Sequence, residues 1–552
     1  MLYVAIMFVQ QTKSKRKNKT YISYLVRESF RTPEGPRSRT VCNITSLPHA
    51  VRTLVADALA GKPMVAVEEI GQSSALDYGG IAVLKEAWER FGLDRLFETV
   101  PSARHRALLR AMIFGRVLFP SSKLGLSEEA RGTLLAAACG LSQTDETFDE
   151  EDLYEAMDQM TGRWVSMEKQ LYQTAFPEGV RLVLYDLTSI YFEGKGPEPM
   201  ARYGYSRDHR SDRKQVLLAV ATDGDGVPIH LEVLRGNRGD TTTLLGLLTT
   251  LRRRFGITEA TFVFDGGMSS RINLEQMEAE QLKYVTRLSS ASLAALVSEL
   301  PSEVQPSLWD RTTLMNVVHE GKRYVIAGGV FRKHRDEERR QTRIAKAEAA
   351  LAKLAKVPRK RPNIQKLVSA AGRLLERLSA HKYFEYRVDD NGVLHYGVKE
   401  ETVREEAALD GLYLLHTNLV SEQANEKKVL GHYKNLIAVE NAFCQLKSYM
   451  EVRPVYHYRP DRVRNHVRIC FIAYWLTARI GQAWRSVGEH GEVPNILRQL
   501  QVIRVGMLTV KDHPLKAIIT RVPKEINALL KKLQLLHLFS EPPKWVTCSP
   551  TK

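Results

Sequence analysis

The amino-acid sequence predicts an α/β protein whose core is interrupted by an insertion domain of mixed β and helical character, with β-rich and all-helical modules ahead of the core. Between residues 179 and 290, apolar runs of strand length alternate with segments of helical periodicity. This alternation stops near residue 291 and resumes near residue 412. The domains predicted on this basis are 1–70, 71–178, 179–290, 291–411, 412–485 and 486–552.

The two modules ahead of the core differ in their hydrophobic pattern. Three β-type runs occupy 3–9, 20–26 and 40–44, and a basic tract lies at 13–19. Such a basic hairpin either rests on a nucleic-acid backbone or forms a solvated loop, and the sequence leaves both readings open. From 79 onward, residues such as Ile81, Leu84 and Trp88 follow the helical period, so we predict a packed helical module with DNA binding as its candidate role.

The first part of the core has a recognisable order of elements. Predicted strands lie at 182–185, 216–222, 228–234, 261–264 and 284–288, and predicted helices lie at 241–255 and 269–281. Three strands, a helix, a strand, a helix and a strand is the order of a ribonuclease-H-like core. In that topology the first and fourth strands are neighbours.

Two of the predicted strands run into a carboxylate. Asp186 follows an apolar run, and Asp265 follows a second one ahead of two glycines that permit a close backbone approach to a ligand. An unpaired charge is costly inside a strand, so we expect both strands to end at these residues in a cleft. Carboxylate oxygens suit Mg²⁺, which usually shares its ligands with substrate phosphates. A third carboxylate is then expected.

Glu440 is the candidate for that third carboxylate. Residues 425–450 have helical periodicity, and Tyr433, Glu440 and Lys447 are spaced by seven, which places them on one face of a regular helix. A carboxylate, an ammonium and a phenol on one stripe suit a site that holds a metal and a phosphate. A solvated helix face is the alternative explanation.

The charge of the chain favours a polyanionic partner. The formal net charge is +17 over 552 residues, and nucleic acid is the default partner for such an excess. Basic residues far outnumber acidic ones between 339 and 382, and the loop at 203–215 is also rich in charge. We predict that DNA phosphates are contacted by Arg359, Lys360 and Arg361 of the first stretch and by Arg207, Arg213 and Lys214 of the loop.

Cysteine usage and hydropathy bear on the compartment. The five cysteines lie far apart without a CxxC pair, which indicates neither a disulfide framework nor a zinc site and favours a reducing cytoplasm. Apolar runs at 1–9 and 469–476 are too short to span a bilayer, so we expect no membrane insertion.

From these motifs, the chain resembles the bacterial insertion-sequence transposases of the DDE class, in particular the group with a large insertion domain and a Tyr–Arg–Glu–Lys signature. Tyr433, Glu440 and Lys447 match that signature, while Leu436 stands at its arginine position and Lys434 is a candidate replacement. Asp186 and Asp265 match the first and second catalytic aspartates of the family. The resemblance extends over about 180–480 and accounts for the insertion ahead of Glu440.

The resemblance implies a function. Asp186, Asp265 and Glu440 would be the catalytic residues and would hold two Mg²⁺ ions, with Mn²⁺ as a substitute. Metal-dependent cleavage at the insertion-sequence ends would be followed by transfer of the 3′-hydroxyl ends into target DNA. Tyr433 and Lys447 would grip the terminal phosphate. The implied partners are double-stranded DNA, as terminal inverted repeats and target, and a second copy in a homodimeric synaptic complex associated with the bacterial nucleoid.

Two other functions fit the same residues. A ribonuclease-H-like nuclease would hydrolyse nucleic acid without joining it, and a non-catalytic DNA-binding protein derived from a transposase would bind without cutting. The complete set of three carboxylates disfavours the second of these. Residues 486–552 serve either dimer contacts or domain packing, and the sequence does not separate these two roles.

Overall fold

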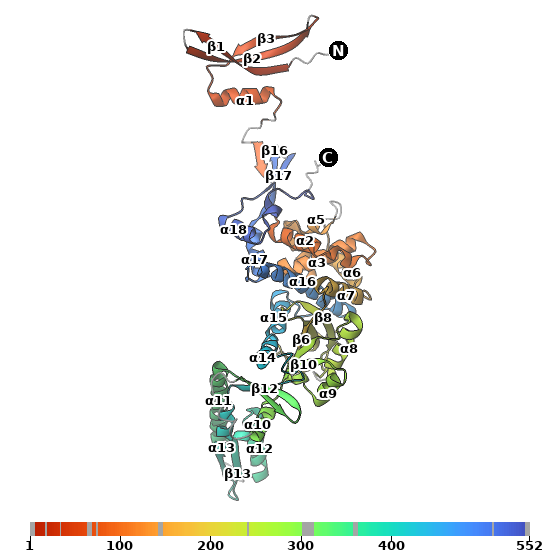
Figure 1. The fold of residues 1–552 in the computed structure, drawn as a ribbon, viewed down its shortest axis with the longest axis vertical. Coiled ribbons are helices and arrows are strands. Elements are labelled where there is room, and N and C mark those ends of the chain that lie inside the picture. The colour runs from red at the N-terminus through yellow and green to blue at the C-terminus, as the bar shows by residue number, and fades with distance from the viewer. Residues whose placement is uncertain are drawn as a thin grey trace. The chain divides into compact units, whose positions relative to one another are not determined.

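The computed structural model describes most of the chain in two units (Figure 1). The described residues are 6–16, 19–33, 35–62, 64, 69–72, 75–141, 147–239, 242–300, 314–356, 363–510 and 513–546. One unit consists of residues 1–76, 504–520 and 541–552, and the other consists of residues 77–503 and 521–540.

An eight-stranded mixed sheet organises the larger unit, in the order β11-β12-β15-β10-β9-β6-β7-β8. β6 pairs antiparallel with β7 on one side and parallel with β9 on the other, and β10 continues the sheet parallel to β9. The five strands of the first part of the core are confirmed, with β6 longer than predicted. They are β6 (Leu182–Tyr191), β7 (Gln215–Thr222), β8 (Pro228–Arg235), β9 (Thr261–Phe264) and β10 (Lys283–Arg287).

One face of this sheet is apolar and packs on helices. Alternate side chains of β6, namely Val183, Tyr185 and Leu187, belong to a buried cluster with leucines of α8 (Leu244–Phe255) and with Met277 of α9 (Arg271–Ala279). Because successive strand residues point to opposite faces, Asp186 lies on the other face. Helices α14 (Glu426–Lys434) and α15 (Ile437–Cys444) are in contact with strands of the same sheet.

The helical section that precedes the sheet forms one body with α16 (Pro460–Ser486). Helices α2 (Gly79–Arg90), α3 (Ala103–Leu118), α4 (Lys123–Glu129), α5 (Leu135–Cys139), α6 (Glu150–Asp158) and α7 (Trp164–Ala175) make up the section, and α17 (Val493–Gln499) packs beside it. α16 starts with a proline at its first turn and is in contact with α3, α6 and β8. Within the described part of the chain, no helix combines the length and apolar character needed to cross a bilayer.

The insertion adds strands to the core sheet and a second small core. β11 (Leu314–His319) and β12 (Lys322–Gly328) join the sheet beside β15 (Leu412–Thr417). The second core lies among long helices and a hairpin, where Leu351, Leu375 and Phe384 are buried. Its elements are α11 (Val330–Ala355), α12 (Ile364–Arg377), β13 (Phe384–Val388), β14 (Leu394–Val398) and α13 (Glu400–Ala408). Helix α10 (Ser290–Glu299) instead packs on strands of the large sheet. The turn between β13 and β14 contains Gly392, which has a positive φ of 77°.

The smaller unit contains two sheets. The first is an antiparallel sheet of β1 (Ile6–Arg16), β2 (Lys19–Thr32) and β3 (Gly35–Asn43), followed by helix α1 (His49–Leu59). The second joins β4 (Ile70–Gln72) to β16 (Arg504–Val510) and β17 (His513–Ile519). The predicted β-type run at 20–26 lies within β2, and residues 6–9 and 40–43 of the other two runs lie within β1 and β3. Residue 44 lies outside β3, and residues 3–5 lie outside the described residues.

Candidate active site

Asp186 and Asp265 lie side by side on neighbouring parallel strands. The register pairs Tyr185 with Phe264, so the next residue of each strand is one of the two aspartates. Phe262 and Phe264 belong to the helix-covered core, as Tyr185 does, and therefore both carboxylates point to the opposite face. The expectation that the two residues lie on adjacent strands is confirmed.

The two aspartates differ in their position along the strand. Asp265 directly follows β9 and is exposed, as the apolar pattern predicts. The expectation that the first strand ends at Asp186 is wrong, because β6 continues to Tyr191. Its antiparallel pairing with β7 extends past Asp186, which opposes Val220, as far as Tyr191 opposite Gln215. The cleft at Asp186 therefore arises from the early end of β9 rather than from the end of β6.

Glu440 completes an electrostatically coupled group of three carboxylates. It lies exposed in the first turn of α15, a helix in contact with β6 and β7. Burial raises the pKa of Asp186 to about 7, and the negative charges of Asp265 and Glu440 add to this rise. The backbone amide of Leu187 and the charge of Arg207 oppose it. The fold therefore brings together three acidic residues that are far apart in the sequence.

The helix that carries Glu440 is not regular, and the predicted single helix over 425–450 is wrong. α14 ends at Lys434, and the backbone then tightens, with the Leu436 amide donating to the Tyr433 carbonyl (3.1 Å) and the Ala438 amide to the Asn435 carbonyl (2.8 Å). Beyond α15, residues Gln445–Tyr449 form a π-helical segment, η8. A regular seven-residue stripe therefore does not relate Tyr433, Glu440 and Lys447.

Tyr433 lies near Asp265, and Lys447 lies near Arg207, the cation that acts on Asp186. Burial raises the pKa of Tyr433 to about 12, as does the nearby charge of Asp265, while a hydrogen bond with Arg287 opposes the rise. Lys447 donates from Nζ to Asp208 Oδ1 over 2.8 Å. Burial lowers the pKa of Lys447 although Asp208 opposes the shift, and the charges of Arg453 and Arg207 lower it further.

The basic loop at 203–215 is only partly directed at the site. The Arg207 amide donates to Ser189 Oγ over 2.9 Å, and its guanidinium is the cation that acts on Asp186. Arg213 instead pairs with Glu193 (2.9 Å), and Lys214 pairs with Glu198 (3.1 Å). The sequence reasoning overlooked these acidic neighbours. Arg359, Lys360 and Arg361 lie outside the described residues.

Asp208 is a further residue that sequence reasoning did not place at the site. Its side chain is only 4% exposed, and its Oδ1 also receives Arg453 Nη1 at 2.7 Å. One buried carboxylate thus holds two cations next to the acidic group. Loop aspartates commonly cap turns, so no local signal distinguishes this one.

A second group that the sequence did not reveal consists of Arg287, Arg332, Tyr413 and Tyr433. The guanidinium of Arg332 lies 4.9 Å from the ring centroid of Tyr413, and that of Arg287 lies 6.0 Å from it. The rings of Tyr413 and Tyr433 are 5.9 Å apart. These residues come from β10, α11, β15 and α14, so the sheet order is needed to bring them together.

Two details refine the roles expected of single residues. Leu436, at the signature's arginine position, is buried at 8% exposure, and Lys434 is exposed at the end of α14. Gly266, which was expected to admit a ligand, admits the neighbouring strand instead, since a Cβ there would lie 2.7 Å from the Arg287 carbonyl oxygen.

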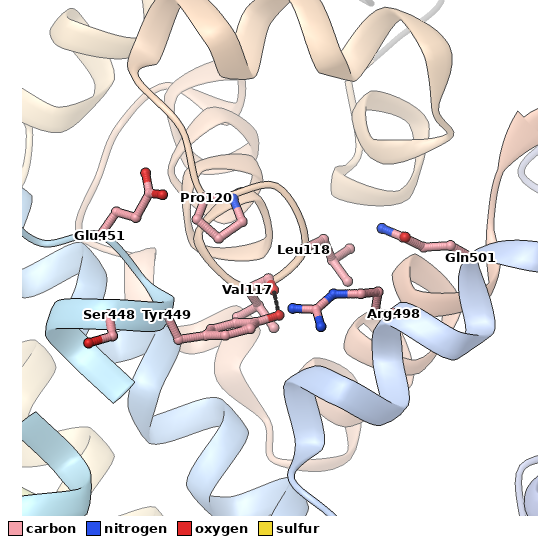
Figure 2. A pocket seen from close by; sticks show the side chains of 8 residues that line it. All are labelled: Val117, Leu118, Pro120, Ser448, Tyr449, Glu451, Arg498 and Gln501. Carbon is pink, nitrogen blue, oxygen red and sulfur yellow. Dashed lines mark hydrogen bonds between the residues drawn. The ribbon is translucent and has the colours of Figure 1, made fainter. Parts of the chain in front are cut away.

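A small cavity adjoins the segment that follows Glu440 (Figure 2). Its volume is about 250 Å³, and Tyr449 and Arg498 project along its wall. Tyr449 donates from its hydroxyl to the Val117 carbonyl over 2.9 Å, and the Arg498 guanidinium lies 5.9 Å from the Tyr449 ring. These contacts attach the end of η8 to α3 and α17 and therefore hold the Glu440-bearing segment in place.

The residues present agree with a hard divalent cation in their chemistry. Three carboxylates that repel one another, one of them with a pKa raised to about 7, are stabilised by a nearby positive ion. Among the described residues, however, no three histidine, cysteine or acidic side chains are close enough to enclose one metal ion as they stand. A bound ion therefore requires these side chains to draw together.

A comparison with known protein families identifies the family of the chain. Residues 178–476 match the family model for the transposase DDE domain. Because this match covers more than half of the 552 residues, the chain belongs to the DDE transposase family. No curated protein matches the chain.

Two solved structures are similar to the chain at low identity. One is a piggyBac transposase synaptic complex with hairpin DNA, at 11% identity and a TM-score of 0.39, covering 77% of this chain and 76% of that one. The other is a Mos1 transposase paired-end complex with left transposon end, at 16% identity and a TM-score of 0.15, covering 26% of this chain and 52% of that one. These likenesses are too distant to assign roles to residues.

Proposed function

We propose that this transposase cleaves DNA at the ends of its own insertion sequence and transfers the freed 3′-hydroxyl ends into target DNA. Asp186, Asp265 and Glu440 are the proposed catalytic residues. The observation that carries the proposal is the electrostatic coupling of these three side chains across β6, β9 and α15. Membership of the DDE family supports it independently.

The three carboxylates are proposed to hold two Mg²⁺ ions, with Mn²⁺ as a substitute, and these ions supply charge neutralisation for the attacking and leaving oxygens. Asp186 must be ionised to bind a cation, and its pKa of about 7 means that it releases a proton when it does so at neutral pH. The exposed Asp265 and Glu440 leave the same face of the sheet open to a DNA strand.

The basic residues on both sides of the carboxylates are proposed to hold phosphates. On one side Tyr433 and Arg287 are hydrogen-bonded next to Asp265, and Arg332 lies beside them. On the other side Lys447 and Arg453 share Asp208. A DNA phosphate would replace or join that carboxylate as their anion, because guanidinium and ammonium groups form charge-assisted hydrogen bonds with either partner. Arg287 and Arg332 would supply the positive charge that Leu436 does not.

We further propose that the partners are double-stranded DNA and a second copy of the chain. The net charge of +17 favours association with DNA and so with the bacterial nucleoid. An insertion sequence has two ends that must be cut together, and a homodimer would place one catalytic domain at each end.

The test is incubation of the purified chain with Mg²⁺ and the DNA that flanks its own gene, followed by mapping of all ends. The proposal expects cuts at the element's ends and joined products in a target plasmid. Cut ends without joined products would indicate a nuclease, and bound but intact DNA would indicate a non-catalytic DNA-binding protein. Either result would replace the proposal.

A further inference from the structure

The two faces of the N-terminal sheet differ in composition. The register places Arg27 opposite Phe8 on β1 and opposite Thr40 on β3, so alternate residues of the three strands form one face around Arg27. The intervening residues, such as Tyr24 and Val26, form the other face. The register therefore assigns each side chain to one of the two faces.

Helix α1 lies against the three-stranded sheet (Figure 1), and its Arg52 assigns it to the face that carries Tyr24. The guanidinium of Arg52, on α1, lies 4.0 Å from the Tyr24 ring centroid, and Val26 is only 6% exposed. This covered face holds the sheet and the helix together. The opposite face, which we call the open face, has no described element packed on it.

The open face is basic and polar. Its described side chains include no acidic residue, because Glu28 lies on the covered face, where it pairs with Arg39 over 2.6 Å. Its cations are Lys19, Arg27 and Arg31, its polar residues include Gln10, Thr12, Ser14, Tyr21, Ser23, Ser29, Ser38 and Thr40, and its apolar residues include Ile6, Phe8 and Leu25. With three cations and no carboxylate among its described side chains, this surface complements a polyanion that carries hydrogen-bonding groups.

Arg27 lies at the centre of this face and is held in place by both neighbouring strands. Its Nη1 donates to Gln10 Oε1 on β1 over 2.7 Å, and its Nη2 donates to the Ser38 carbonyl on β3 over 2.9 Å. Its Nε has no hydrogen-bond partner among the described residues. A guanidinium fixed in this way loses little conformational entropy when it contacts a further acceptor.

The dimensions of the sheet fit one groove of duplex DNA. Three strands at a spacing of roughly 4.8 Å measure about 10 Å from the first backbone to the third. The major groove of B-DNA is about 12 Å wide and admits a two-stranded β-ribbon, whose side chains then reach the base edges, so two of the three strands can enter it together.

We infer that the open face of β1, β2 and β3 binds duplex DNA in the major groove and reads the terminal repeat of the element. The inference rests on the proposed function, for which it supplies the recognition surface. Lys19 and Arg31 contact phosphates, and Arg27 with its neighbours Gln10 and Ser38 faces the bases. Phe8 and Leu25, also on this face, provide apolar contacts to thymine methyl groups.

The phosphate contacts are tested with the full chain by measuring the dissociation constant over a range of salt concentrations. The probes are a duplex from the element's own end and a scrambled duplex of the same length. We expect the Lys19→Ala/Arg31→Ala double variant to weaken binding of both probes and to reduce the salt slope by about two units. The matched control is Arg39→Ala, which removes a cation from the covered face of the same sheet and should leave the slope unchanged.

The reading of bases is tested separately with Arg27→Lys, which keeps the charge and loses the planar fork. The preference for the terminal duplex over the scrambled one should fall by roughly ten- to a hundredfold, while the salt slope stays near that of the wild type. Gln10→Ala provides a second variant with a smaller perturbation of the sheet, and circular dichroism of each variant checks that the fold persists.

Unchanged binding by the Lys19→Ala/Arg31→Ala variant would overturn the inference while leaving the transposase proposal to the cleavage assay. A loss of catalysis can likewise be told apart from a loss of DNA binding, because Asp186→Asn should bind the terminal duplex like the wild type and fail to cut it. Sedimentation of the chain without DNA tests whether this face instead binds a second copy of the chain. A smaller species for the double variant would assign the face to contacts between copies and would also overturn the inference.

Discussion

Two acidic residues on opposite faces of the same sheet, one fully buried and one partly buried, have opposite electrostatic environments. Glu168 of α7 is fully buried, and its carboxylate receives His230 Nδ1 over 2.9 Å, the Leu231 amide over 3.0 Å and the Arg254 guanidinium. Burial alone would raise its pKa, but His230, the Leu231 amide and Arg254 together hold the pKa of Glu168 below its usual value. This carboxylate is fully paired within the fold.

Asp186 is the contrasting case. Burial raises its pKa to about 7, and the nearest charged groups include two further carboxylates. The Leu187 amide and the charge of Arg207 lower the pKa of Asp186, but they do not offset its burial, and an incompletely compensated charge near the interior is costly. We therefore expect a cation from outside the chain to balance this charge, as the proposed metal site requires.

The largest expected effect is the loss of DNA cleavage when one of the three proposed catalytic carboxylates is replaced. Asp186→Asn, Asp265→Asn and Glu440→Gln should each lower the rate of end cleavage by at least about 10³-fold, because each removes a proposed ligand for a divalent cation. The rate is measured on the terminal duplex under single-turnover conditions.

Asp223→Asn is the matched control for this prediction. Burial raises the pKa of Asp223 to about 6, but its Oδ1 accepts the Asp225 and Val227 amides at 3.0 and 2.8 Å and so shapes the turn between β7 and β8. An asparagine keeps both hydrogen bonds, and cleavage should persist. Wild-type cleavage by any triad variant would remove that residue from the site.

Glu168, which is paired within the fold, should matter for the stability of the fold and not for DNA cleavage. Glu168→Ala should lower the free energy of unfolding by about 3–5 kcal/mol, because it leaves His230 and Arg254 without their anion inside the fold. Urea denaturation measures the change, and Glu168→Gln serves as a smaller perturbation. If Glu168→Ala left stability unchanged and abolished cleavage, the comparison between the two carboxylates would fail.

The free energy of unfolding should depend on pH through Asp186. The pKa of Asp186 rises from its ordinary value of 3.8 to about 7 in the folded chain, so the folded chain binds more protons than the unfolded chain between about pH 4 and 7. Stability without metal should therefore fall as the pH rises through this window. Asp186→Asn should be more stable than the wild type by roughly 2 to 4 kcal/mol at pH 8 and equal to it near pH 4. Parallel stability curves for the two proteins over this window would contradict the assignment.

The extent to which the sequence predicts this structure depends on how local each signal is. The strands of the core were predictable because their apolar runs are continuous, and Asp265 was correctly placed after one of them. The length of β6 was not predictable, since its second half is held by pairing with β7 across a charged loop. The change of helical type between Tyr433 and Lys447 likewise leaves the apolar period almost intact.

The neighbours of the site were the least predictable part. Arg287 and Tyr433 are brought together only by the order of strands and helices in space, and Arg332 belongs to the insertion. For the same reason the loop cations Arg213 and Lys214 looked available to DNA, whereas acidic residues from other turns pair with both. Charge counted along a chain does not show which charges are already neutralised.

The smallest expected effect is stabilisation of the free protein by metal. A cation that binds the Asp186 group should raise stability by about 2 kcal/mol when present at roughly thirty times its dissociation constant. The effect should be largest near pH 8 and smaller at pH 6, where Asp186, with its pKa of about 7, retains its proton in most molecules. Thermal unfolding with Mg²⁺ or Mn²⁺ measures the shift. Asp186→Asn should lose it and Glu168→Gln should keep it, because only the first removes a proposed ligand of the cation. Equal shifts in both variants would place the bound ion elsewhere on the chain.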